Sequence, residues 1–162
     1  MPRSNARAQL AELGHWPARI CKYFESPLLL AIRLYWGYQF TLSGWGKLHR
    51  IPAVTEFFAS LNLPAPHFTA IFVSLVEFVG GILFALGLGS RIVSFVLFIN
   101  MSVAFWTADR EAFGTIFSSD PSKFYAADPY TFWFAALLIL IVGPGYFAAD
   151  TLLHHITTRD ES

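Results

Sequence analysis

The sequence predicts an all-α membrane protein, a single four-transmembrane-helix bundle with short interfacial helices. Hydrophobic residues make up 55% of the 162 residues and charged residues only 14%, whereas soluble domains carry about 25% charged residues. The aromatic share of 17% is too large for so small a soluble domain to hide from water. The run from Phe132 to Val142 has no polar side chain, although a soluble bundle needs a polar outer face. Lipid is therefore the expected surrounding.

Four apolar runs have about the 20 residues needed to cross about 30 Å of hydrocarbon. They extend from about Pro27 to Leu48, Pro66 to Leu88, Arg91 to Ala108 and Tyr130 to Ala149. These runs divide the chain into a cytoplasmic or interfacial N-terminal segment (1–26), a four-helix transmembrane domain (27–149) and a cytoplasmic tail (150–162).

The segment before the first run has two interpretations. Apolar side chains recur in it at helical spacing among basic ones, at Leu10, Leu13, Trp16, Ile20 and Phe24. This pattern is typical of a helix that lies in the membrane interface, with a kink at Pro17. The alternative is a partly frayed tail. Because the first apolar run begins only near Pro27 and is long enough to remain as an anchor, we expect no cleavable signal peptide.

The basic residues predict the orientation of the bundle, because lysine and arginine near the ends of spans favour the cytoplasm. One side of the bundle has Arg3, Arg7, Arg19, Lys22, Arg91 and Arg159, and the other has Lys47, Arg50, Arg110 and Lys123. The excess on the first side predicts that both termini are cytoplasmic.

Two loops on the opposite side contain apolar residues. An apolar stripe of Val54, Phe57, Phe58 and Leu61 predicts a short helix resting on the bilayer. Residues 109–129 mix charged residues with aromatic ones, and we expect this loop to pack over the mouth of the bundle.

The first span carries one face that is both small and basic. Its members follow each other at spacings of four, three, four and three, and they are Arg33, Gly37, Phe40, Gly44 and Lys47. Small residues allow a second helix to approach closely, and Gly80, Gly81 and Gly87 offer the same in the second span.

A buried arginine needs a partner, because charge inside a membrane costs several kcal/mol. Glu77, near the middle of the antiparallel second span, lies about 16 Å from the cytoplasmic end and Arg33 about 9 Å. We therefore expect an ion pair between Arg33 and Glu77. The pair would either set the register of the helices or line a polar pocket for a small ligand.

Four further residues are candidates for such a ligand pocket. Asn100 lies at mid-depth in the third span with Trp106 nearby, and Trp45 and His49 lie at the outer end of the first span. Each also has a structural interpretation, because tryptophans at span ends commonly anchor the bilayer interface and a lone asparagine commonly bonds another helix.

Other classes of function have no signal in the sequence. The formal net charge is zero, so we expect no nucleic-acid partner. Cys21 is the only cysteine and the five histidines have no metal-binding spacing, so we expect neither a metal nor a covalently bound cofactor. Redox chemistry would require a bound molecule or a partner protein.

The order of these features resembles the DoxX family of four-helix membrane proteins. The pieces that carry the resemblance are Arg33 through Gly44 to Lys47, Leu61-Asn62-Leu63-Pro64, Glu77-Phe-Val-Gly-Gly81 with Leu86-Gly-Leu-Gly-Ser-Arg91, and Gly143-Pro-Gly145 with Asp150. The resemblance implies a bacterial inner-membrane protein linked to redox work, such as a subunit of a quinone-linked oxidoreductase or a partner of oxidative-stress enzymes. Other relatives resemble chaperones without evident catalysis.

The leading hypothesis is a membrane subunit that binds a quinone-like or small sulfur-oxyanion ligand within the bundle and works with a soluble redox partner. Arg33 or Lys47 would polarise a ligand oxygen. The alternative is a non-catalytic scaffold or chaperone that recruits proteins through residues 109–129. A third option is proton-coupled transport through Glu77, for which four helices leave little room unless the chain forms a homodimer.

Overall fold

The structure is a computed structural model that describes residues 3–151, with side chains from Tyr23 onward, and this part of the chain contains helices and no β-strand. The all-α prediction is confirmed. In chain order the helices are α1 (Arg3–Leu48), α2 (Ile51–Ser60), α3 (Pro66–Leu86), α4 (Ser90–Thr107), α5 (Arg110–Gly114), α6 (Ser122–Ala126) and α7 (Pro129–Val142).

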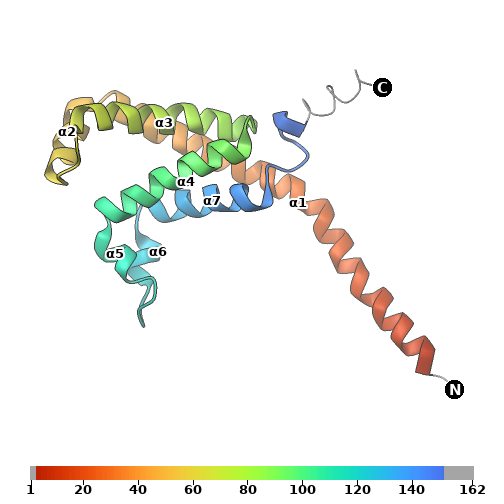
Figure 1. Cartoon of the computed structure of the whole chain (residues 1–162). Coiled ribbons are helices and arrows are strands. Elements are labelled where there is room, and N and C mark those ends of the chain that lie inside the picture. Colours follow the sequence, from red (N-terminus) through yellow and green to blue (C-terminus); the bar gives the residue numbers. More distant parts are fainter. Residues whose placement is uncertain (1–2, 152–162) are drawn as a thin grey trace.

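Four helices form the bundle, in which α1 packs mainly against α3 and α4 mainly against α7 (Figure 1). The short helices α2, α5 and α6 lie toward the same end of the bundle, where α2 packs against α3 and, apart from it, α5 and α6 pack against each other. The tight turn from α3 to α4 and the end of α7 lie at the other end, where the N-terminal part of α1 projects away from the bundle.

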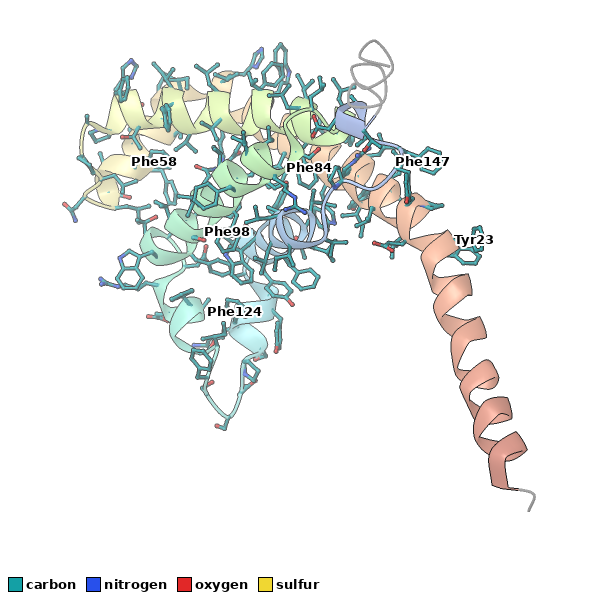
Figure 2. All side chains as sticks on the ribbon, turned by 45° about the vertical axis from the view of Figure 1, so that its right-hand side comes forward. Tyr23, Phe58, Phe84, Phe98, Phe124 and Phe147 are labelled. Atoms are coloured by element: carbon teal, nitrogen blue, oxygen red, sulfur yellow. The ribbon has the colours of Figure 1, made fainter. Side chains whose placement is uncertain are left out.

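The helix α1 has 46 residues and continues through the position expected to separate the N-terminal segment from the first span. Its axis changes direction where it enters the bundle, and Tyr23 lies on the projecting part (Figures 1 and 2). Pro27, which has no N–H to donate to the helix, explains a bend in this region. The side chains of Leu10, Leu13, Trp16 and Ile20, and residues 152–162, lie outside the described part.

Besides its apolar core, the bundle buries several polar side chains and exposes many large apolar ones, which is unlike the surface of a soluble protein. On α3 the exposed large side chains recur at spacings of four and three, and they are Phe68, Phe72, Leu75, Val79, Ile82 and Leu86. On α4 they include Ile92, Phe95, Val96, Ile99 and Val103. Both helices are long and apolar enough to cross a membrane, and they begin and end within two residues of the predicted boundaries.

The prediction that the fourth apolar helix extends to Ala149 is wrong. The helix α7 is apolar but has only 14 residues and ends at Val142. Gly143 takes a φ of 97°, outside the helical region, and Pro144 has no N–H to continue the hydrogen bonds. The chain after Val142 therefore leaves the helix and folds back against α1.

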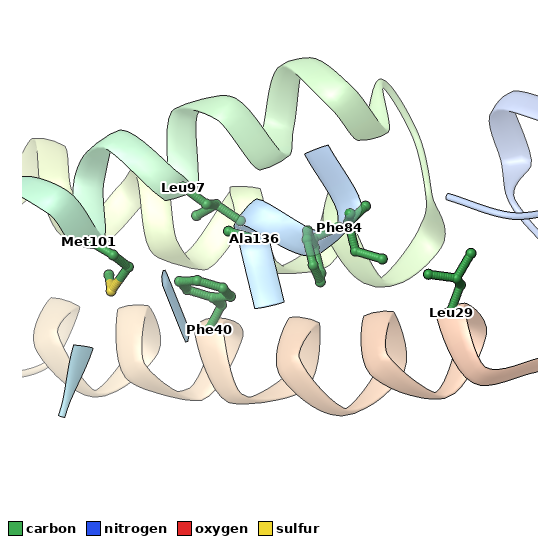
Figure 3. Packing of buried hydrophobic residues seen from close by; sticks show 7 residues of the cluster. Leu29, Phe40, Phe84, Leu97, Met101 and Ala136 are labelled. Atoms are coloured by element: carbon green, nitrogen blue, oxygen red, sulfur yellow. The ribbon is translucent and has the colours of Figure 1, made fainter. Parts of the chain in front are cut away.

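The core is a cluster of apolar side chains from α1, α3, α4 and α7. Figure 3 shows Phe40 near the middle of this cluster, close to Leu97, Ala136 and Phe84. Met101 lies toward one end of the cluster and Leu29 toward the other. A second group of aromatic rings joins α4, α6 and α7. Phe124 of α6 is buried, and its ring centroid is 5.0 Å from that of Phe105 on α4 and 5.2 Å from that of Tyr130 on α7.

Glycines allow α1 and α3 to touch through their backbones. A Cβ atom added to Gly44 would lie 2.7 Å from the carbonyl oxygen of Ser74, and one added to Gly37 would lie 2.7 Å from the Cβ of Ala85. A Cβ atom added to Gly81 of α3 would lie 2.6 Å from the backbone nitrogen of Thr41 on α1. These contacts determine how far the two antiparallel helices are shifted along each other.

Candidate functional site

The site is built around Glu77, whose side chain is only 1% exposed near the middle of α3. Lys47 of α1 reaches both carboxylate oxygens, with its Nζ 2.5 Å from Oε1 and 2.6 Å from Oε2. Two neutral side chains also donate to the carboxylate: Ser43 Oγ at 2.8 Å to Oε2 and Asn100 Nδ2 at 3.2 Å to Oε1. The four residues connect α1, α3 and α4 at one point.

This arrangement satisfies the energetic requirement of a buried charge. A carboxylate removed from water is tolerated when a cation and additional hydrogen bonds replace its hydration. The Lys47 side chain is 32% exposed, so its ammonium group reaches the carboxylate without losing all contact with the surroundings.

A cavity of about 370 Å³ lies on one side of the pair, beneath α2. Its walls are mainly apolar and come from α2, α3 and α4, and they include Phe57, Phe58, Leu61, Val73, Val103 and Ala104. Lys47, Glu77 and Asn100 provide the polar groups at its inner end, and the exposed Arg50 also lines it. The size and the mixture of apolar walls with a few polar groups are typical of small-molecule sites.

A second cavity, of about 220 Å³, lies on the other side of the same pair. It is bounded by α1, α4 and the start of α7, and its lining includes Ser43, Met101 and Asp128. Lys47, Glu77 and Ala104 line both cavities. The ion pair therefore separates two hollow regions of the bundle.

The predicted ion pair between Arg33 and Glu77 is wrong, because Glu77 pairs with Lys47 instead. The glycine contacts place Gly44 against Ser74 and Phe78, which brings Glu77 level with Ser43 and Lys47. Arg33 lies further along α1, where its guanidinium occupies the space beside Gly87 at the end of α3. The prediction placed the start of the bundle at Pro27, whereas the turn after α3 packs beside Arg33.

Arg33 instead joins α1 to the segment that follows α7. It is 1% exposed and donates from Nη1 to the carbonyl of Pro144 and from Nη2 to the carbonyl of Phe147, each at 2.8 Å. These carbonyls belong to a stretch without helical hydrogen bonds of its own. The arginine therefore satisfies backbone groups that the early end of α7 leaves free.

Asp150 completes this end of the bundle by capping α4. Its carboxylate accepts hydrogen bonds from the N–H of Gly89 at 2.7 Å and of Ser90 at 2.8 Å. Burial by itself raises the pKa of Asp150, but these hydrogen bonds and the nearby charge of Arg33 lower the pKa below its usual value of 3.8. The ionised carboxylate is therefore the form that the fold stabilises.

Replacing Asp150 by alanine should lower the free energy of unfolding by about 1 kcal/mol near neutral pH, the usual cost of losing a helix cap. Because the pKa is lowered in the folded state, the contribution of the carboxylate is complete above the unfolded pKa near 3.8 and disappears as the pH falls below it. Unfolding in mixed detergent micelles at pH 7 and pH 3 measures the difference.

The matched control is Asp109→Ala, because Asp109 precedes α5 without a side-chain capping bond. We expect no comparable loss from it. An Asp150→Ala deficit that stayed constant from pH 7 to pH 3 would show that the carboxylate charge has no part in the cap.

The other candidate residues lie away from the two cavities. Trp45 is 51% exposed. The centroid of its ring lies 4.3 Å from that of His49 and 5.5 Å from that of Phe78. Trp106 is also exposed, with the Arg110 guanidinium 5.2 Å from its ring. Of the predicted ligand-binding residues, the structure brings Lys47, Glu77 and Asn100 together and leaves Arg33, Trp45, His49 and Trp106 elsewhere.

Sequence reasoning did not select Ser43 and Asp128, two polar residues that line the smaller cavity. Ser43 precedes Lys47 by four residues and so shares its helical face, which is a signal that the sequence contains. Asp128 comes at the start of α7, and nothing in the sequence relates it to α1. Among the residues that the structure describes, no three His, Cys, Asp or Glu side chains gather as a metal site would require.

The fold and site define an all-α, membrane-associated protein with an ion pair buried between two cavities. The chain belongs to the DoxX family, whose family model matches residues 28–110, about half of the chain. This region contains α2, α3, α4 and the part of α1 that bears Lys47. Residues after 110, including α7 and Asp150, lie outside the match.

Among curated proteins, the chain is similar to a Bacillus subtilis (strain 168) protein described as "Putative oxidoreductase CatD", with 32% identity over 91 residues. The similarity covers 56% of this chain and 66% of the relative, slightly less than two thirds of that protein's length. No solved structure matches the chain.

Proposed function

We propose that this chain is the membrane subunit of a redox system and that it binds a quinone-like ring in the cavity beneath α2. The observation that carries the proposal is the position of Lys47, Glu77 and Asn100 at the inner end of a cavity whose other walls are mainly apolar. An apolar ring fits such walls, and Lys47 or Asn100 can donate to a ring carbonyl. The similarity to a protein described as an oxidoreductase supports the class.

The same geometry favours a quinone-like ligand over a sulfur oxyanion. Glu77 already neutralises Lys47, and its carboxylate would repel an anion at the inner end of the cavity. Arg50 is the other charged residue in the lining, and it is exposed. A neutral ring with polar substituents therefore suits the cavity better than a compact anion.

In the proposed topology α1, α3 and α4 cross the bacterial inner membrane, the shorter α7 makes the fourth crossing together with the chain that follows it, and both termini are cytoplasmic. The exposed apolar faces of α3 and α4 support this placement. The end that carries α2, α5 and α6 then faces away from the cytoplasm, and the cavity beneath α2 opens near that surface. Electrons would come from a soluble partner, because no described side chain can store them.

Binding of a short-chain ubiquinone analogue to the detergent-purified protein tests this function. Val73 lines the cavity, so Val73→Phe should fill part of it and weaken binding by about tenfold or more, equivalent to about 1.4 kcal/mol. Val79→Phe is the matched control on the same helix, because Val79 is exposed and lies outside the cavity. Titration calorimetry provides the dissociation constants.

Equal binding by the wild type, Val73→Phe and Val79→Phe would reject the cavity as the quinone site. Thiosulfate, titrated in parallel, tests the oxyanion alternative. Binding of thiosulfate but not of the quinone analogue would favour the sulfur oxyanion over the quinone-like ring as the ligand.

A second candidate function is a scaffold that recruits proteins through residues 109–129. Phe113 and Phe124 of this segment pack inward against Phe105, but Phe117 between them is 95% exposed. A photo-crosslinking residue at position 117, in native membranes, tests for a partner. Capture of a protein there, together with no quinone binding, would favour the scaffold.

A further inference from the structure

The two cavities on either side of the Lys47–Glu77 pair differ in their walls. Beyond the residues that they share, the larger cavity is lined mostly by aromatic and aliphatic side chains from α2, α3 and α4. The smaller cavity also has apolar walls, which come from Phe40, Met101, Pro129 and Phe132. It adds Ser43 beside the carboxylate and Asp128, an exposed residue, at the start of α7. The first provides room for an apolar ring, and the second provides polar groups for water.

The smaller cavity meets the requirements for internal water. A volume of about 220 Å³ is far above the minimum of about 15 Å³ for one water molecule. Ser43, Lys47, Glu77 and Asp128 supply the two to four polar partners that an ordered water needs. Asp128 is exposed while Glu77 is not, so these polar residues lead from the surface to the buried carboxylate.

We propose that the smaller cavity is a water-filled route by which protons reach the Lys47–Glu77 pair, with Asp128 at its mouth. The ion pair then has a ligand on one side and water on the other. A bound ligand that has gained electrons from the soluble redox partner accepts a proton from the Lys47 ammonium group. A proton from the bulk solvent, relayed through water in the smaller cavity, then reprotonates the Lys47 amine and restores the charged pair. Arg50 is the remaining charged residue in either lining, and it belongs to the larger cavity.

The proton transfer to a ligand depends on the proposed function, but the water route itself does not. Protons need a route through the protein because the exposed faces of α3 and α4 are apolar and offer no path for ions.

Cysteine accessibility in phosphatidylethanolamine and phosphatidylglycerol vesicles tests the route. Cys21→Ser removes the only native thiol, and single cysteines are then placed by Ser43→Cys in the smaller cavity, Val73→Cys in the larger one and Ala136→Cys in the closed core. Charged methanethiosulfonate reagents should modify Ser43→Cys at least about tenfold faster than Val73→Cys or Ala136→Cys. An uncharged maleimide should also reach Val73→Cys.

A second measurement tests the role of the exposed Asp128 carboxylate at the mouth of the smaller cavity. With Asp128 present, a cationic reagent should modify Ser43→Cys faster than an anionic reagent of the same size, because a negative charge attracts cations to the mouth. Asp128→Asn keeps the shape of the side chain and should abolish this preference. Met101→Cys, also in the smaller cavity, serves as a second probe if Ser43→Cys does not fold.

Protection of both Ser43→Cys and Met101→Cys from charged reagents would overturn the proposal, as would equal modification of Val73→Cys. A charge preference unaffected by Asp128→Asn would remove Asp128 from the mouth. None of these measurements uses a quinone. Failure of quinone binding with the expected labelling would therefore reject the proposed ligand and retain the water route.

Discussion

Replacing Lys47 by methionine is expected to lower the free energy of unfolding by about 3–5 kcal/mol, the usual cost of removing one partner from a buried ion pair. Glu77 is 1% exposed and would remain without a cation. It would then either keep an uncompensated charge or take up a proton, and both carry a cost. The partial exposure of Lys47 places the expected loss near the lower end of the range. Unfolding in mixed detergent micelles measures it.

Two further variants separate charge from shape. Lys47→Arg keeps the cation and should recover most of the lost stability. The double variant Lys47→Met with Glu77→Met removes both charges, and it should be less destabilised than the sum of the single changes, because no buried charge is left unpaired. Strict additivity of the two single changes would mean that the pair contributes no coupling energy.

Replacing Gly44 by alanine is expected to be nearly as damaging, because α1 and α3 touch at this residue. The added Cβ would lie 2.7 Å from the Ser74 carbonyl oxygen, a backbone atom that moves only if the whole helix moves. Overpacking of this kind costs about 1–3 kcal/mol or more. Separation of the helices would also draw Ser43 and Lys47 away from Glu77, so the ligand site should weaken together with the fold.

Gly46→Ala is a control of the same chemistry on the same helix. A Cβ at Gly46 meets nothing within 4 Å, so the change should be neutral or slightly stabilising through the better helix propensity of alanine. Equal unfolding free energies for Gly44→Ala and Gly46→Ala would show that the helices separate without cost, contrary to the close contact of α1 and α3 at Gly44.

Several parts of the fold follow from local sequence. Hydropathy and helix-ending residues place α3 and α4 to within two residues, because Pro66 begins one helix and Gly87 ends it, and these signals act over a single turn. At the end of α7, hydropathy and the helix-ending signal disagree, and the structure follows the helix-ending signal. The pair Gly143-Pro144 ends the helix there, although the apolar run continues to Ala149.

The sequence by itself determined the helical class, the apolar surface and the face of α1 that carries Arg33, Gly44 and Lys47, since each depends on composition or on the period of one helix. The tertiary structure alone decided which cation meets Glu77. That choice depends on the shift of α1 along α3, which is set by backbone contacts at glycines far apart in the chain. A shift of a few residues exchanges one basic partner for another, and no pattern within a single helix encodes it.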